Sequence, residues 1–182
     1  MFNHAGDLKD KLALVQMIDS SAYPHAWDVS MELTDFLNKE LSRKDTFYVI
    51  DVKDEIKLSG MKNPFSSDTN WLMQDFAHVD YVVFTELLKH EQTTEKDNPY
   101  PANYNLDMAL RVRVFKKKDN GFEVVLQEIQ KDSFILPTIF QNAFMTQPNF
   151  QEKGYELSPL GLAHQKFISG TAKRIRDYIQ QK

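Results

Sequence analysis

The sequence contains no cysteine, few glycines and no long uninterrupted hydrophobic run. Without cysteine the chain has no thiol nucleophile, no thiolate ligand for zinc and no disulfide. This composition suits either a reducing cytoplasm or an envelope protein that avoids unpaired thiols. No apolar run approaches the roughly 18 residues of a membrane-spanning helix, so we expect no such helix. The six glycines never occur as Gly-x-Gly, so the sequence carries neither a dinucleotide-binding fingerprint nor a Walker A loop.

The rest of the composition is that of an ordinary globular protein. Hydrophobic residues make up 42% and charged residues 26% of the 182 residues, which predicts a single domain, 1–182, with a substantial core. The formal charge of −4 counts against a dedicated nucleic-acid-binding surface, because phosphate contacts need basic side chains. The opening sequence lacks the charged and apolar regions of a signal peptide, and it leaves open whether a signal peptide and a lipobox precede Met1.

Two hydrophobic segments, separated by a helical pattern, predict a strand–helix–strand unit. Leu12–Ile18 has the length and apolar density of a buried strand, and Thr46–Val52 is rich in aromatic and β-branched residues. Such a unit requires a right-handed crossover and a parallel pair of strands. Apolar residues between the two segments follow helical spacing and predict one amphipathic helix of about five turns. They are Val29, Leu33, Phe36, Leu37 and Leu41.

The middle of the chain predicts three further strands. SSDTNWLMQDF predicts a short capped helix that leads into a strand over VDYVVFTELL. Glu91–Asn105 is polar and contains two prolines, which predicts an exposed loop or a simple hairpin connection. LDMALRVRVF and FEVVLQEIQ flank Asp119-Asn120-Gly121, residues that tolerate the positive φ of a tight hairpin turn. We therefore expect these two strands to pair directly.

A C-terminal helix completes the predicted fold. Ser158 and Pro159 suit an N-cap and a first helical position, and apolar residues continue at helical spacing almost to the end of the chain. The sequence thus predicts an α/β fold with a mixed sheet of about five strands, in the order β-α-β-α-β-β-β-α. Residues 131–157 form an apolar insertion before this helix.

That insertion is the first candidate partner-binding region. It contains Phe134, Phe140 and Phe144 in an irregular apolar stretch that a minimal fold does not require. One interpretation is that Ile135–Phe140 form another strand or a loop covering the core, because apolar residues are usually buried. The other is an exposed apolar surface that docks a partner.

A basic face of the sheet is the second candidate. Arg111 and Arg113 alternate with apolar residues and so project from the same side of one strand, with Lys116 near the turn. Cross-strand pairing with acidic or amide neighbours explains such residues without any binding role. The alternative is an open sheet face or edge that receives an anionic partner or an added strand.

No catalytic or metal-binding signature is present. Asp28, Glu32 and Asp35 fall on one helical face, where they predict a solvated surface in preference to a cation site. The five histidines lack the i, i+4 spacing of a shared metal site, and no GxSxG nucleophile elbow accompanies His78 or His164 in a hydrolase arrangement. We therefore predict no catalytic, cofactor-binding or metal-binding residue and no enzymatic activity.

Several strand sequences resemble a domain shared by bacterial envelope lipoproteins. TFYVIDVKDEI, DYVVFTEL and LRVRVFKKKDNGFEVV occupy positions that read like "F.VIDR..L", "ADYVV.G.I" and "L.VRVFD..TGEVV" in those families, after a similar first strand, KLALVQMIDSS. The families include the curli secretion lipoprotein, the peptidoglycan synthase activator lipoproteins and the anticodon-binding-like amino-terminal domain of the Tol-Pal β-propeller protein. The sequence departs from them at Thr85, where the pattern favours glycine, and in having no lipobox cysteine.

This resemblance implies a non-enzymatic protein of the cell envelope. Its members are periplasmic lipoproteins, held at the outer membrane by an amino-terminal lipid, that bind other envelope proteins or self-assemble. No functional residue carries over, because the shared patterns are structural. Related β-α-β topologies leave a second possibility, a cytoplasmic nucleic-acid-binding or anticodon-binding-like module, which the acidic composition disfavours.

Overall fold

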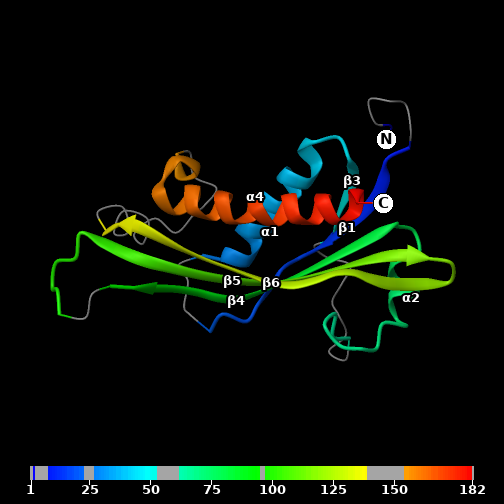
Figure 1. Ribbon diagram of the computed structural model, residues 1–182, viewed down its shortest axis with the longest axis horizontal. Coiled ribbons are helices and arrows are strands. Elements are labelled where there is room, and N and C mark those ends of the chain that lie inside the picture. The colour runs from blue at the N-terminus through cyan, green and yellow to red at the C-terminus, as the bar shows by residue number, and fades with distance from the viewer. Residues whose placement is uncertain are drawn as a thin grey trace.

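The computed structural model describes residues 2, 8–22, 27–52, 62–94, 97–138 and 154–181. Over these residues the chain forms a six-stranded mixed sheet with helices on both faces, which confirms the predicted α/β class (Figure 1). The elements follow one another as β1 (Asp10–Val15), β2 (Ile18–Asp19), α1 (Val29–Arg43), β3 (Phe47–Val52), α2 (Leu72–Phe76), β4 (Tyr81–Thr93), β5 (Asn103–Lys118), β6 (Gly121–Pro137), the 3-10 helix η1 (Tyr155–Leu157) and α4 (Pro159–Gln180).

The strands lie in the order β3-β1-β4-β5-β6, with β2 also paired to β4. β1 is parallel to both β3 and β4, as the predicted crossover requires. The predicted first strand is split in two, because the Met17 amide donates to Thr34 Oγ1 of α1 at 3.0 Å between β1 and β2. This separate short strand makes the sheet one strand larger than predicted.

The hairpin at Asp119-Asn120-Gly121 forms as predicted. Lys118 pairs with Gly121, so two residues make the turn, and Asp119 has a φ of 49°. β4 and β5 extend well beyond the predicted strands and include both ends of the segment Glu91–Asn105 that was expected to be a loop, since β4 continues to Thr93 and β5 begins at Asn103. Polar residues occupy these strand ends because one side of the sheet faces solvent there.

The predicted stripe of α1 faces the sheet, and all five of its apolar residues are buried. Asp28 caps α1 by accepting a hydrogen bond from the Met31 amide at 3.0 Å. Ser158 caps α4 in the same way, accepting from the Gly161 amide at 3.0 Å, with Pro159 at the first helical position as predicted.

The helices divide the protein into layers. α1 and α4 cross the same face of the sheet and bury the larger apolar core against it (Figure 1). α2 and the segment around Phe65 cover part of the opposite face, where a smaller core includes Phe76, Phe84 and Phe115. Among the described residues, no helix has the length and hydropathy needed to span a membrane.

Candidate functional site

Arg113, one of the predicted partner-binding cations, lies inside the protein. Its Nη1 donates to the carbonyl oxygens of Pro64 at 3.0 Å and Ser66 at 2.6 Å, and its guanidinium lies 5.0 Å from the Phe115 ring centroid. Only 8% of the residue is exposed, and burial lowers its pKa. The side chain thus fastens the loop before α2 to the sheet, which leaves little of it for a partner.

Arg111 lies two residues away on the same face, at the boundary where the covered part of the sheet ends. Its Nε forms an ion pair with Glu86 of β4 at 3.1 Å, and the guanidinium lies over the Phe65 ring. Cross-strand pairing of this kind with an acidic neighbour is one of the two predicted explanations for Arg111. More than a third of the Arg111 side chain is accessible.

Beyond Arg111 the described helices leave this face uncovered, and we call the region the open sheet face. Register places its residues side by side on three adjacent strands: Glu86, Lys89 and Glu91 of β4, Asp107, Ala109 and Arg111 of β5, and Ile129, Lys131, Ser133 and Ile135 of β6. Ile129 is 54% exposed and Ile135 is 74% exposed. Charged residues around them form ion pairs, such as that between Lys89 and Asp107 at 3.9 Å. Two exposed isoleucines amid paired charges make a mixed surface suited to a protein partner.

The structure does not gather the other predicted binding residues there. Lys116 pairs with Tyr81 and lies on the helix-covered side of the sheet, and Phe134 packs against the larger core. Residues 131–137 of the predicted insertion are the end of β6, so Ile135 belongs to a long existing strand. Phe140 and Phe144 lie outside the described residues. Partner binding by these residues stays a prediction.

The most unusual chemistry lies in a buried polar network that the sequence did not reveal. The Glu32 carboxylate accepts hydrogen bonds from Trp27 Nε1 at 2.7 Å, from the Tyr155 hydroxyl at 3.0 and 3.1 Å, and from His164 Nδ1 at 2.5 Å. The His164 Nε2 atom lies 2.8 Å from Nε2 of His90. Glu32 and His164 have no exposed surface at all.

The prediction that Glu32 lies on a solvated surface is wrong, because this network buries it. The network also shows which groups surround His164, the histidine considered for a hydrolase arrangement. A carboxylate–imidazole pair occurs in hydrolases, but there the imidazole also needs a nucleophile and access for substrate. Here the imidazole meets a second imidazole, and both rings are buried. The arrangement therefore joins α1, η1 and α4 to β4 and offers no reactive surface.

Periodicity contains a signal for both residues. Glu32 follows Val29 by three positions and precedes Phe36 by four, which places it on the buried stripe of α1. His164 has the same relation to Leu160 and Phe167 in α4, at four and three positions.

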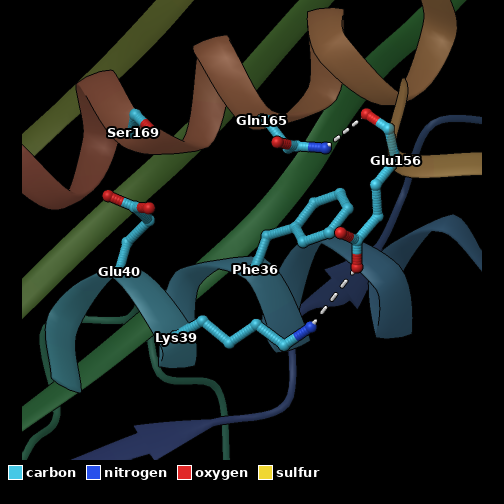
Figure 2. A pocket seen from close by; sticks show the side chains of 6 residues that line it. All are labelled: Phe36, Lys39, Glu40, Glu156, Gln165 and Ser169. Carbon is cyan, nitrogen blue, oxygen red and sulfur yellow. Dashed lines mark hydrogen bonds and ion pairs between the residues drawn. The ribbon is translucent and has the colours of Figure 1, made fainter. Parts of the chain in front are cut away.

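A shallow groove lies between α1 and α4 on the outer side of the helix layer (Figure 2). Phe36 forms its floor, and the ion pair between Lys39 and Glu156, with a separation of 3.8 Å, crosses it. Gln165 donates to the backbone carbonyl of Glu156 at 2.9 Å. The groove has a volume of about 110 Å³, well below the roughly 300 Å³ at which small-molecule pockets begin.

The pKa values of two tyrosines in and near the network are raised by their surroundings. Burial, followed by the charge and hydrogen bond of Glu32, raises the pKa of Tyr155 far above its ordinary value. Tyr155 therefore keeps its proton and acts as a donor to Glu32. Burial raises the pKa of Tyr104 on β5 to about 12. No group of acidic or histidine side chains among the described residues has the arrangement of a metal site.

Comparison with known proteins gives one family match and several related folds. The family described as a family of unknown function (DUF7499) matches residues 2–182. No curated protein matches the chain. The hypothetical protein CT253 from Chlamydia trachomatis is similar at 20% identity with a TM-score of 0.73, covering 96% of this chain and 100% of that one.

Two further structures carry names that bear on the predicted class. The lipoprotein GNA1162 from Neisseria meningitidis is 11% identical with a TM-score of 0.50, over 92% of this chain and 99% of that one. PelC from Paraburkholderia phytofirmans, solved as a dodecamer, is 12% identical with a TM-score of 0.51, over 89% and 84% of the two chains. At these identities the likeness shows a shared fold, and bacterial lipoproteins are among the proteins that have it. The narrower likeness to the curli, synthase-activator and Tol-Pal families stays a prediction.

Proposed function

The chain belongs to the DUF7499 family, and we propose that it is a non-enzymatic, lipoprotein-type domain of the bacterial cell envelope that binds other envelope proteins or further copies of itself. In the full-length precursor an amino-terminal lipid holds it at the periplasmic side of a membrane. The observation that carries this proposal is the fold, which the lipoprotein GNA1162 shares over nearly the whole of both chains.

The buried network supports a binding role over a catalytic one. The carboxylate–imidazole pair of Glu32 and His164 is itself fully buried, and its hydrogen bonds go to the buried side chains of Tyr155 and His90 and to the partly buried Trp27. A general acid or base must reach the proton of a substrate directly or through one water. Neither group meets that requirement in this arrangement.

The open sheet face and the outer edge of β6 provide the binding surface. β6 is 17 residues long and pairs only with β5 among the described strands, so its other edge presents backbone donors and acceptors. An added strand from a partner would extend the sheet there, while Ile129 and Ile135 would supply apolar contacts. PelC, which shares the fold, forms a dodecamer, and this supports including self-association in the proposal.

The test combines crosslinking with variants of matched chemistry. The domain serves as bait for crosslinked envelope and cytoplasmic fractions of the source organism, and light scattering after size-exclusion chromatography measures its oligomeric state. Ile129→Lys and Arg111→Glu change the open sheet face. Lys173→Glu is the control, because Lys173 is an exposed, ion-paired cation on the outer side of α4.

Recovery of envelope proteins, or a defined oligomer, that the two sheet-face variants lose and the control retains would support the proposal. All variants should change the melting temperature by less than about 4 °C, since substitutions at exposed or partly exposed positions change stability little. Capture of RNA, or of cytoplasmic proteins alone, would instead favour a nucleic-acid-binding or cytoplasmic module and overturn the envelope assignment.

A further inference from the structure

The hydrogen bond between His90 and His164 allows only certain protonation states. Each neutral imidazole has one N–H donor and one acceptor nitrogen, whereas an imidazolium has two donors. The two Nε2 atoms are 2.8 Å apart, so one of them must donate and the other must accept. A single proton therefore lies between the two rings.

Glu32 fixes which atoms carry the protons at neutral pH. An ionised carboxylate only accepts hydrogen bonds, and three donors converge on Glu32. His164 consequently carries a proton on Nδ1, and in the neutral ring its Nε2 accepts. His90 is then the donor through its own Nε2.

One additional proton leaves the network intact, but a second does not. If His164 becomes an imidazolium, it stays paired with Glu32, its Nε2 donates, and His90 accepts with its own proton on Nδ1. If both rings are imidazolium, two N–H groups face each other and two positive charges share a buried site. The hydrogen bond between α4 and β4 cannot form in that state.

We propose that Glu32, His164 and His90 form an acid-sensitive lock between the helix layer and the sheet, which holds with at most one added proton and opens when the second proton binds. The lock includes the start of α4, the first turn of α1 and η1, because Tyr155 shares the Glu32 carboxylate. Opening it in acid would loosen these elements from β4 together.

Described titratable groups face the two rings from the elements packed against them. Among the described residues, Glu32 faces His164 from α1, Tyr155 faces it from η1, and His90 faces it from β4. Tyr104 of β5 is near enough to contribute to the raised pKa of Tyr155. Both tyrosines are neutral in acid, so Glu32 is the one described anion in contact with the two rings.

Proton linkage gives the expected size and sign of the effect. An unfolded chain protonates both histidines below a pH of about 6.5, whereas the locked state holds at most one of these two protons. The unfolded state then binds at least one proton more, so stability falls as the pH falls. The unfolding equilibrium constant should rise about tenfold per pH unit from this difference alone.

The test compares urea unfolding of the wild-type protein and His90→Gln between about pH 7 and pH 5, the range in which histidine titrates. A glutamine amide can donate to Nε2 of His164 or accept from it, but it cannot take up a proton. The ratio of the wild-type to the variant unfolding constant should rise only slightly just below pH 7 and approach a tenfold rise per pH unit below a pH of about 6.5, because other groups affect both proteins alike. His78→Gln, at an exposed histidine outside the network, is the control and should keep the wild-type slope.

The proposal would be overturned if the unfolding constants of the wild-type protein and His90→Gln changed in parallel with pH. If His90→Gln does not fold, nuclear magnetic resonance of the wild-type ring nitrogens decides the question. At neutral pH the lock requires a proton on Nδ1 of His164 and on Nε2 of His90. Conversion of both rings to imidazolium in the folded protein would refute the lock.

Discussion

Replacing Arg113 by alanine should destabilise the protein far more than the same replacement at Arg111. The Arg113 guanidinium is buried and donates to two loop carbonyls, whereas Arg111 forms a partly exposed ion pair with Glu86. A hydrogen bond to a charged group contributes roughly 1.5–3 kcal/mol to stability, and buried carbonyl oxygens left without a donor add to the loss. We therefore expect Arg113→Ala to lower the free energy of unfolding by about 3 kcal/mol. The Arg111 variant should cost at most about 1 kcal/mol.

Thermal and urea unfolding measure this difference directly. In a chain of this length 1 kcal/mol shifts Tm by roughly 2–4 °C, so Arg113→Ala should lower Tm by about 6–12 °C and Arg111→Ala by less than about 4 °C. Arg113→Lys should fall between them, because a lysine keeps the charge but has no planar fork. Equal losses for the two alanine variants would refute the structural role assigned to Arg113. Binding experiments should therefore reverse the charge at Arg111 alone.

Three further predictions test packing and titration. In α4, Gly161→Ala should destabilise the protein, because its new Cβ would collide with the Tyr155 carbonyl oxygen. The Cβ of Gly170→Ala would meet nothing within 4 Å, so this variant should stabilise the protein by about 0.5–1 kcal/mol. A shift of both melting temperatures in the same direction would contradict this prediction. Ile168→Ala should cost about 2–5 kcal/mol in urea unfolding, since it empties a fully buried site, and a loss below about 1 kcal/mol would mean that the site collapses. Burial raises the pKa of Tyr104 to about 12, so the folded state keeps a proton that the unfolded state releases above a pH of about 10. Stability should fall by about 1.4 kcal/mol per unit between these values, and Tyr104→Phe should remove that loss in alkaline unfolding experiments.

The order of elements was predictable because each one has a local cause. The stripe from Val29 to Leu41 repeats with the period of a helix, and the residues of the turn at Asp119 accept the backbone that a tight hairpin needs. The full length of β4 and β5 was not predictable in this way. Their polar ends have weak alternation and are held by pairing with distant strands, as between Asp107 and Ser133.

The functional residues were harder to predict for a related reason. Alternation correctly placed Arg111 and Arg113 on one face, but the exposure of each depends on a loop, near Pro64, that lies far away in the sequence. Likewise, Glu32 and His164 are 132 positions apart, so no local pattern shows that they meet. Helical spacing could predict that Glu32 and His164 are each buried. Their contact with each other depends on how the chain brings α1 and α4 together.

The position of α4 determines when the protein can first become stable during synthesis. This helix starts at Pro159 and contributes a large share of the apolar side chains that cover the sheet, including Phe167, Ile168 and Ile175. Until the ribosome has released those residues, β4, β5 and β6 display a wide uncovered apolar face. Any shorter nascent chain should therefore remain open to chaperones and, for an exported protein, to a translocation channel that accepts only unfolded polypeptide.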